Sequence, residues 1–357
     1  MRKRFLTSVI ILFVCAGLFG CGKDNVSSKE PEHAEEENAK ERIVIGFSQL
    51  GAESDWRSAN TESMKATFTS ESGYELIIED GQQKQANQIM AIRTFIQQEV
   101  DYIVLAPVTE TGWDTVLQEA KDAGIPVIIL DRRVDVSDDN LYTAWVGSDF
   151  TLEGEKAGEW IRQYLLAKGI ENANIVNIQG TIGSSAQIGR TRGLQRACEE
   201  NDNMTLLAEV VGDFTQARGK EVMESLLNQY DDINIVYCEN DNEAFGAIDA
   251  IEAAGKTVGS DIQAGEIMVV SFDGVKQDAM EHIQKDKITC IIECNPQQGP
   301  HVREIIEDLE AGRTPEKFSY VDESMYAHDA TVQSVSVNGE EYPVTVVTRE
   351  IMDSRSY

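Results

Sequence analysis

Polar side chains stand directly after several apolar runs of this chain. Asp131 and Arg132 follow the run at 127–130, and Asp273 follows the run at 268–272. Phe214, Asn240 and Glu293 follow other apolar runs closely, Trp56 and Arg57 end the polar segment after the run at 43–47, and Arg190 lies on the predicted helix beyond the run at 175–178. Carboxylates and guanidinium groups form charge-assisted hydrogen bonds with hydroxyl groups, and aromatic rings cover apolar C–H faces. Such a mixture is suited to holding a polyhydroxyl compound selectively, because each buried polar group needs a partner.

Each of these residues also has a plainer interpretation. Asp131 could cap a helix or shape a turn, and Asp273 with the following glycine could simply form a turn. Trp56 could belong to the core of an amphipathic helix, and Arg190 could be a surface charge. Their shared position after apolar runs in both halves of the chain favours a binding role.

The runs alternate with segments of helical periodicity. Strands are predicted at 43–47, 75–78, 102–106, 127–130, 175–178, 206–211, 235–238 and 268–272. Helices are predicted at 56–70, 85–98, 113–123, 152–166, 185–199, 216–228 and 244–254. Runs that are apolar on both faces are typical of central strands in a parallel sheet. The repeated strand–helix alternation predicts an α/β chain with two doubly wound domains, with a single large sheet as the alternative. In such sheets, ligands bind beyond the carboxyl ends of the strands.

Motifs for cofactors, metals and covalent catalysis are incomplete. Gly255-Lys256-Thr257 follows a predicted helix instead of opening one, and the glycines at 180 and 183 do not complete a dinucleotide fingerprint. The chain has four histidines and no CxxC or HExxH pattern, so no metal site is expected. Cys290 and Cys294 would lie about 13 Å apart on one strand, too far to pair. We therefore expect free thiols, no cofactor and no enzymatic activity.

The N-terminus has the pattern of a bacterial secretory leader. A basic start at residues 2–4 and an apolar stretch at 6–18 lead to Gly20-Cys21. This resembles a lipobox, in which residues 1–20 are removed and Cys21 is lipidated; an ordinary signal peptide with a chance cysteine is the alternative. Residues 21–42 are polar and acidic, which predicts a disordered spacer. The expected location is the extracellular face of the cell membrane.

The chain is strongly acidic, with a formal net charge of −31. Nucleic acid carries a dense negative charge of its own, so it is excluded as a partner. No stretch after the leader has the length and apolar character of a transmembrane helix.

Many of these segments resemble one family, the type I periplasmic sugar-binding proteins of the ribose/galactose class, particularly the galactofuranose-binding proteins of ABC importers. The resemblance is carried by the segments 45–49, 53–54, 56–57, 80–85, 106–108, 111–113, 130–132, 212–214, 219–225, 240–241 and 273–275. It implies two Rossmann-like lobes joined by a three-strand hinge. The N-terminal lobe would comprise 43–145 plus 295–320, and the C-terminal lobe 146–294 plus 321–357.

The resemblance also implies a ligand set. The expected ligand-binding residues are Glu53, Ser54, Trp56, Arg57, Asp131, Arg132, Asp149, Arg190, Phe214, Asn240, Asp273 and Glu293. Asp55 and the segment 144–148 depart from the pattern of furanose binders, which leaves the identity of the sugar open. The region after about residue 314 resembles the family poorly.

The implied function is capture of a monosaccharide, galactofuranose-like or a related pentose or hexose, by hinge closure. The protein, a monomer, would deliver the sugar to the transmembrane subunits of an ABC permease. One alternative is a sugar-sensing co-receptor for a membrane histidine kinase or chemoreceptor. Another is a sugar-modifying enzyme, which would need a pair of catalytic carboxylates.

Overall fold

The computed structural model describes residues 42–355 and residue 357. The predicted signal peptide, Cys21 and all but the last residue of the predicted spacer lie outside the described residues. Within them, no helix combines the length and the apolar character needed to cross a membrane.

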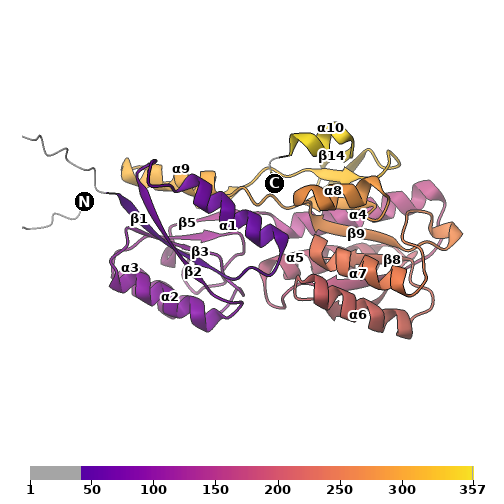
Figure 1. The fold of residues 1–357 in the computed structure, drawn as a ribbon, viewed down its shortest axis with the longest axis horizontal. Coiled ribbons are helices and arrows are strands. Elements are labelled where there is room, and N and C mark those ends of the chain that lie inside the picture. The colour runs from indigo at the N-terminus through magenta and orange to yellow at the C-terminus, as the bar shows by residue number, and fades with distance from the viewer. Residues whose placement is uncertain (1–41, 356) are drawn as a thin grey trace, which may run out of the picture. The chain divides into compact units, whose positions relative to one another are not determined.

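A six-stranded parallel sheet forms the first half of the molecule (Figure 1), with the strand order β11-β5-β4-β3-β1-β2. Its strands are β1 Ile43–Gln49, β2 Tyr74–Asp80, β3 Tyr102–Leu105, β4 Val127–Leu130, β5 Ala144–Gly147 and β11 Phe318–Tyr320. Its helices are α1 Asp55–Thr67, α2 Gln85–Gln97, α3 Asp114–Asp122 and α9 Gly299–Glu310, with a short 3₁₀ turn, η1 Asp139–Leu141. Met64 of α1 and Val302 of α9 pack on one face of the sheet, and Phe95 of α2 packs on the other. We call this unit the first lobe.

An eight-stranded sheet forms the second half, with the strand order β13-β14-β12-β10-β9-β8-β6-β7. Its strands are β6 Ala173–Gln179, β7 Met204–Val211, β8 Ile235–Cys238, β9 Met268–Asp273, β10 Cys290–Glu293, β12 Met325–Ala327, β13 Ser334–Val337 and β14 Glu340–Val346. Its helices are α4 Phe150–Lys168, α5 Ser185–Glu200, α6 Gln216–Gln229, α7 Asp241–Ala253, α8 Lys276–Gln284 and α10 Arg349–Ser354, with the 3₁₀ turn η2 Ile262–Ala264. The strands from β7 to β10 are parallel, whereas β12 and β13 pair antiparallel to their neighbours β10 and β14. We call this unit the second lobe.

The chain passes between the lobes three times, at residues 148–149, 294–298 and 321–324. These crossings lie side by side. The Ser148 hydroxyl donates to a carboxylate oxygen of Glu323 and lies 3.3 Å from the Cys294 sulfur, and the Asn295 amide donates to Glu323 over 3.3 Å. The predicted α/β class, with two doubly wound lobes and a three-stranded connection, is confirmed. The alternative of one large sheet is wrong.

The described cysteines, Cys198, Cys238, Cys290 and Cys294, are all free, as predicted.

Candidate functional site

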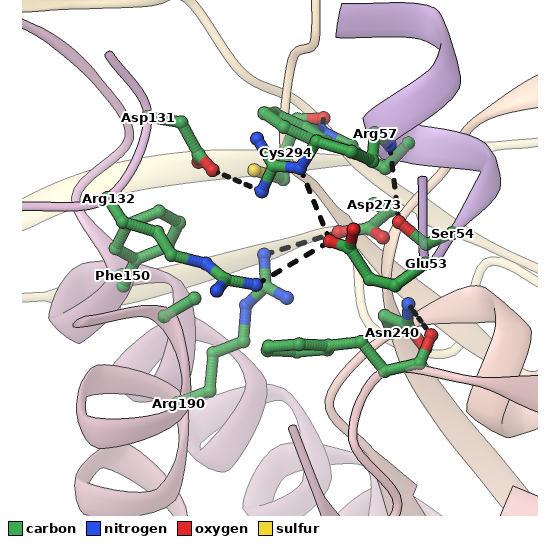
Figure 2. A pocket seen from close by; sticks show the side chains of 13 residues that line it. Glu53, Ser54, Arg57, Asp131, Arg132, Phe150, Arg190, Asn240, Asp273 and Cys294 are labelled. Carbon is green, nitrogen blue, oxygen red and sulfur yellow. Dashed lines mark hydrogen bonds and ion pairs between the residues drawn. The ribbon is translucent and has the colours of Figure 1, made fainter. Parts of the chain in front are cut away.

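A small cavity lies where the carboxyl ends of the strands of both lobes meet (Figure 2). It is lined by Glu53, Ser54, Trp56, Arg57, Asp131, Arg132, Phe150, Ala186, Arg190, Phe214, Asn240, Asp273 and Cys294. About 20 Å³ of the cavity is open to the centre of a water molecule, inside a hollow of about 270 Å³ that also includes open solvent. The charged side chains that line it, such as Arg57, Asp131 and Arg190, are buried, so a ligand can enter only if the lobes or the lining side chains move apart.

The loop between β1 and α1 supplies one wall of the cavity. The Ser54 hydroxyl accepts a hydrogen bond from the Arg57 amide (3.2 Å), which caps the helix and fixes its first turn. The Trp56 indole N–H donates to the carbonyl of Cys294 (2.7 Å), tying this turn to a hinge crossing. The Arg57 guanidinium lies 4.6 Å from the Trp56 ring centroid, so the two side chains brace each other.

Asp131 occupies a strained backbone position at the end of β4. Its φ is +63°, a left-handed conformation that non-glycine residues adopt rarely. The Asp131 amide donates to the carbonyl of Val146 (2.7 Å), and the Trp145 indole donates to the carbonyl of Asp131 (3.0 Å). A side chain at position 147 would collide with that same carbonyl, so Gly147 is required there. These contacts aim the Asp131 carboxylate at Arg57, with 2.6 Å between Oδ2 and Nη2.

Arg190 forms the wall on the side of the second lobe. Its Nε lies 2.7 Å from Oε2 of Glu153, its Nη2 lies 3.3 Å from Oδ1 of Asp273, and its Nη1 donates to the carbonyl of Glu239. The Tyr237 hydroxyl donates to the carbonyl of Arg190 (2.8 Å). The guanidinium is therefore held at several points while one edge faces the cavity.

Phe214 and Asn240 complete the second-lobe wall. Asn240 caps α7 by accepting from the Glu243 amide (2.8 Å), and its own amide group donates to the carbonyl of Phe214 (3.1 Å). The Phe214 ring lies against Gly180, where any side chain would collide with it. Arg132 of the first lobe lies 5.1 Å from the Phe214 centroid, so this ring contacts both lobes.

The cavity has equal numbers of guanidinium and carboxyl groups, but several of their polar atoms have no hydrogen-bond partner among the described residues. Three guanidinium groups (Arg57, Arg132 and Arg190) face three carboxylates (Glu53, Asp131 and Asp273). Oε2 of Glu53, Nη1 of Arg57 and Nε of Arg132 are buried without a hydrogen bond within the described residues. Leaving a buried polar group unpaired costs free energy. The Glu53 atom is an acceptor and the two arginine atoms are donors, and neighbouring hydroxyl groups of a ligand could pair with all three because a hydroxyl both donates and accepts.

Burial and neighbouring charges lower the pKa of Arg132 and raise the pKa of Asp273. The pKa of Arg132 is lowered to about 10 by burial and by the nearby positive charge of Arg57. The pKa of Asp273 is raised well above its usual range by burial, although Arg190 opposes that rise. Both effects show that charged groups are held here at a cost in solvation.

Ten of the twelve predicted ligand-binding residues line the cavity, and Asp149 and Glu293 do not. Asp149 instead caps α4 by accepting from the Leu152 amide (3.0 Å). Glu293 points away from the cavity and pairs with Arg355 (2.8 Å) and with the Tyr357 hydroxyl (2.8 Å).

Phe150, Ala186 and Cys294 line the cavity but were not predicted from the sequence. Successive residues of an extended segment point to opposite sides, so Glu293 and Cys294 were not both expected to face the cavity, but the sequence alone does not show which of them does. The two departures noted in the sequence also lie outside the lining. Trp145 supports Asp131 from behind, and Asp55 contacts Asn242 of the other lobe.

Comparisons with known proteins agree with this architecture. Residues 45–302 match the family model described as a periplasmic binding protein domain. The galactofuranose-binding protein YtfQ of Escherichia coli K12 is 40% identical over 297 residues, which cover 82% of this chain and 90% of that protein.

Two solved structures are similar along most of their length. A Mycobacterium smegmatis protein in complex with β-D-fucofuranose has a TM-score of 0.76 at 40% identity, covering 81% of this chain and 92% of that one. The binding protein component of the arabinose ABC transporter of Shewanella sp. ANA-3, bound to α- and β-L-arabinofuranose, has a TM-score of 0.74 at 37% identity, covering 81% and 93%. The chain therefore belongs to the periplasmic binding protein family, in its type I sugar-binding class.

Proposed function

We propose that this protein is the substrate-binding lipoprotein of an ABC sugar importer and that it captures a monosaccharide in the furanose form. The observation that carries this proposal is the cavity between the lobes, where three guanidinium groups, three carboxylates and three aromatic rings converge. The similar proteins named above bind galactofuranose, fucofuranose and arabinofuranose, which supports a five-membered sugar ring.

The chemistry of the lining suits a neutral sugar better than an anion. Equal numbers of guanidinium groups and carboxylates leave the cavity without an excess of positive charge. The buried atoms without partners on Glu53, Arg57 and Arg132 would pair with hydroxyl groups. Trp56 of the first lobe and Phe214 of the second would cover the apolar faces of the ring.

Capture would proceed by hinge closure. The residues that line the cavity are buried with the lobes in the arrangement described, so entry of a sugar requires the lobes to separate at the three crossings. The lobes that would move about this hinge are the expected ones, 43–145 plus 295–320 and 146–294 plus 321–357, except that residues 146 and 147 belong to β5 and therefore to the first lobe. Bound sugar would then favour closure through contacts that exist only when both walls are in place.

Delivery to the permease and lipid attachment at Cys21 complete the proposal. An acyl anchor would keep the protein at the extracellular face of the membrane, close to the permease subunits. One of the similar structures is the binding protein component of an arabinose ABC transporter. This supports a role in import rather than in sensing for the present protein. Binding without catalysis is the expected outcome in the cavity.

Native mass spectrometry of freshly purified protein tests the proposal, followed by carbon NMR of the protein with galactose labelled at its anomeric carbon. We expect the mass of one hexose or pentose above that of the protein, and an anomeric shift typical of a furanose. A bound pyranose would contradict the ring form. Conversion of the sugar to a product would contradict the absence of catalysis.

A further inference from the structure

The first turns of α1 and α7 meet across the gap between the lobes. The Asp55 amide, at the start of α1, donates to Oδ1 of Asn242 in α7 over 3.0 Å. The Asn242 amide group in turn lies 3.4 Å from Oδ2 of Asp55. This reciprocal pair joins residues 187 positions apart in the sequence, one from each lobe.

The contact has a clear physical basis in the ends of the two helices. The first amides of a helix have no partner inside the helix. The Ser54 side chain satisfies the amide of Arg57, and Asn242 accepts from the amide of Asp55, so the cap of α1 is completed from the other lobe. The positive ends of two helices also repel each other, and the Asp55 carboxylate between them reduces that repulsion.

The pair lies directly beside the cavity without lining it. Ser54 precedes Asp55, and Asn240 lies two positions before Asn242; both caps line the cavity. A separation of Asp55 from Asn242 therefore moves two walls of the binding site apart. Other hydrogen bonds between described residues also join the lobes. The amide of Glu110 donates to the carbonyl of Gly183 (3.0 Å) and the amide of Arg133 to the Ser185 hydroxyl (2.9 Å), so both use backbone amides of the first lobe.

From this arrangement we propose that Asp55 and Asn242 form a latch that holds the lobes closed and sets how long a bound sugar stays. They are positioning residues: they act through Ser54 and Asn240 and do not contact the sugar. The latch rests on the proposed function, since it governs release from that same cavity. It assigns Asp55, which the sequence analysis connected with sugar identity, to closure instead.

Stopped-flow measurement of sugar dissociation tests the latch, with the fluorescence of the cavity residue Trp56 as the signal and L-arabinose and D-galactose as probes. Asn242→Ala removes both contacts and should speed dissociation about three- to tenfold. Asp55→Ala removes the carboxylate and keeps the backbone donor, so it should also speed dissociation. The effect of the double variant should be smaller than the sum of the two single effects, expressed as free energies, because the two residues share one contact. Association rates should change little, since the latch forms only on closure.

Asn242→Asp separates the latch from the stability of α7. An acid in the first turn of a helix stabilises that helix, so the melting temperature of the sugar-free protein should be kept. The new carboxylate would face the carboxylate of Asp55 and repel it, so sugar dissociation should be faster. Asp114→Ala is the matched control: Asp114 also starts a first-lobe helix, but it bonds to Ser137 in the same lobe. Its sugar dissociation should equal that of the unmodified protein.

Three outcomes would overturn the latch. Unchanged dissociation in Asn242→Ala would do so while leaving the proposed sugar binding intact. Additive effects of Asp55→Ala and Asn242→Ala would show that the residues act separately. Failure of the unmodified protein to bind either probe, or any other pentose or hexose, would refute the proposed function and the latch with it.

Discussion

Arg132 is the residue at which stability and binding should conflict most clearly. Its guanidinium is buried, and Nη1 donates to the carbonyl of Val108 (2.9 Å). Among the described residues, Oε1 of Glu53 lies 3.7 Å from Nη2, and Nε has no hydrogen-bond partner. Replacing Arg132 by methionine, which is also long and unbranched, removes the charge and largely preserves the volume.

The magnitude follows from the protonation of Arg132. Burial, together with the charge of Arg57, lowers its pKa to about 10, and that lowering corresponds to roughly 3 kcal/mol of unfavourable free energy for the charged form. The side chain is charged at every pH below about 10, so this cost is present in full at neutral pH. Methionine removes the cost but loses the hydrogen bond to Val108, which contributes about 1.5–3 kcal/mol because its donor is charged.

The two effects nearly cancel, so Arg132→Met should leave the sugar-free protein as stable as before or more stable by up to about 1.5 kcal/mol. Its melting temperature should therefore be unchanged or rise by up to about 5 °C. Sugar affinity should fall by about 1–3 kcal/mol, or roughly 5- to 150-fold, since a charged donor to a hydroxyl is lost.

Differential scanning calorimetry and titration calorimetry measure the two quantities separately. Arg133→Met is the matched control: Arg133 is adjacent, but its guanidinium rests on the Trp145 ring (4.4 Å) and bonds to the Tyr320 hydroxyl, outside the cavity. Its sugar affinity should be unchanged. A loss of more than about 2 kcal/mol of stability in Arg132→Met, together with unchanged sugar affinity, would show that Arg132 is structural and would refute this reasoning.

Three further predictions concern the groups behind the cavity wall. Gly180→Ala should displace the Phe214 ring, since the added methyl group would collide with it, and titration calorimetry should show at least about a tenfold weaker affinity; unchanged affinity would mean that the ring is not needed. Trp145→Phe removes the hydrogen bond to the carbonyl of Asp131 and should lower the free energy of unfolding by about 1–3 kcal/mol in urea denaturation; no loss would show that the carbonyl finds another partner. Burial raises the pKa of Glu239 to about 7, so its contribution to stability is complete below about pH 4.5 and is lost as the pH rises through about 7, by roughly 3 kcal/mol. Glu239→Gln should flatten that part of the pH profile, and an unchanged slope would contradict the assignment.

Part of the binding site could be predicted because ligands of open α/β sheets bind beyond the carboxyl ends of the strands. Parallel strands end at one edge of a sheet, so Asp131 could be placed at this edge of the first sheet and Asp273 at this edge of the second without knowing any side-chain contact. Arg190 lies on helix α5, and its place beside them was implied by the family resemblance. The helix starts were less accurate. Helix α7 begins at Asp241 because Asn240 caps it, three residues before the predicted start at 244.

What the sequence could not provide depends on contacts between distant residues. Asp55 differs from the pattern of furanose binders, and only its contact with Asn242, far away in the chain, indicates a role in closure. Glu293 was assigned to the cavity because it follows an apolar run, but Arg355 and Tyr357 hold it on the other side of the strand. The hairpin of β13 and β14 could have been predicted locally from the dipeptide Asn338-Gly339. This pair is typical of tight hairpin turns, and both residues adopt positive φ in this one.

Titration calorimetry on refolded, sugar-free protein tests the central claim most directly, using a panel of pentoses and hexoses that includes L-arabinose, D-fucose and D-galactose. We predict binding of one sugar per protein, with a negative heat-capacity change as the lobes bury apolar surface on closing. The heat should be greatly reduced in Arg132→Met and retained in Arg133→Met. Absence of heat with every sugar of the panel, in protein shown to be folded, would contradict the account.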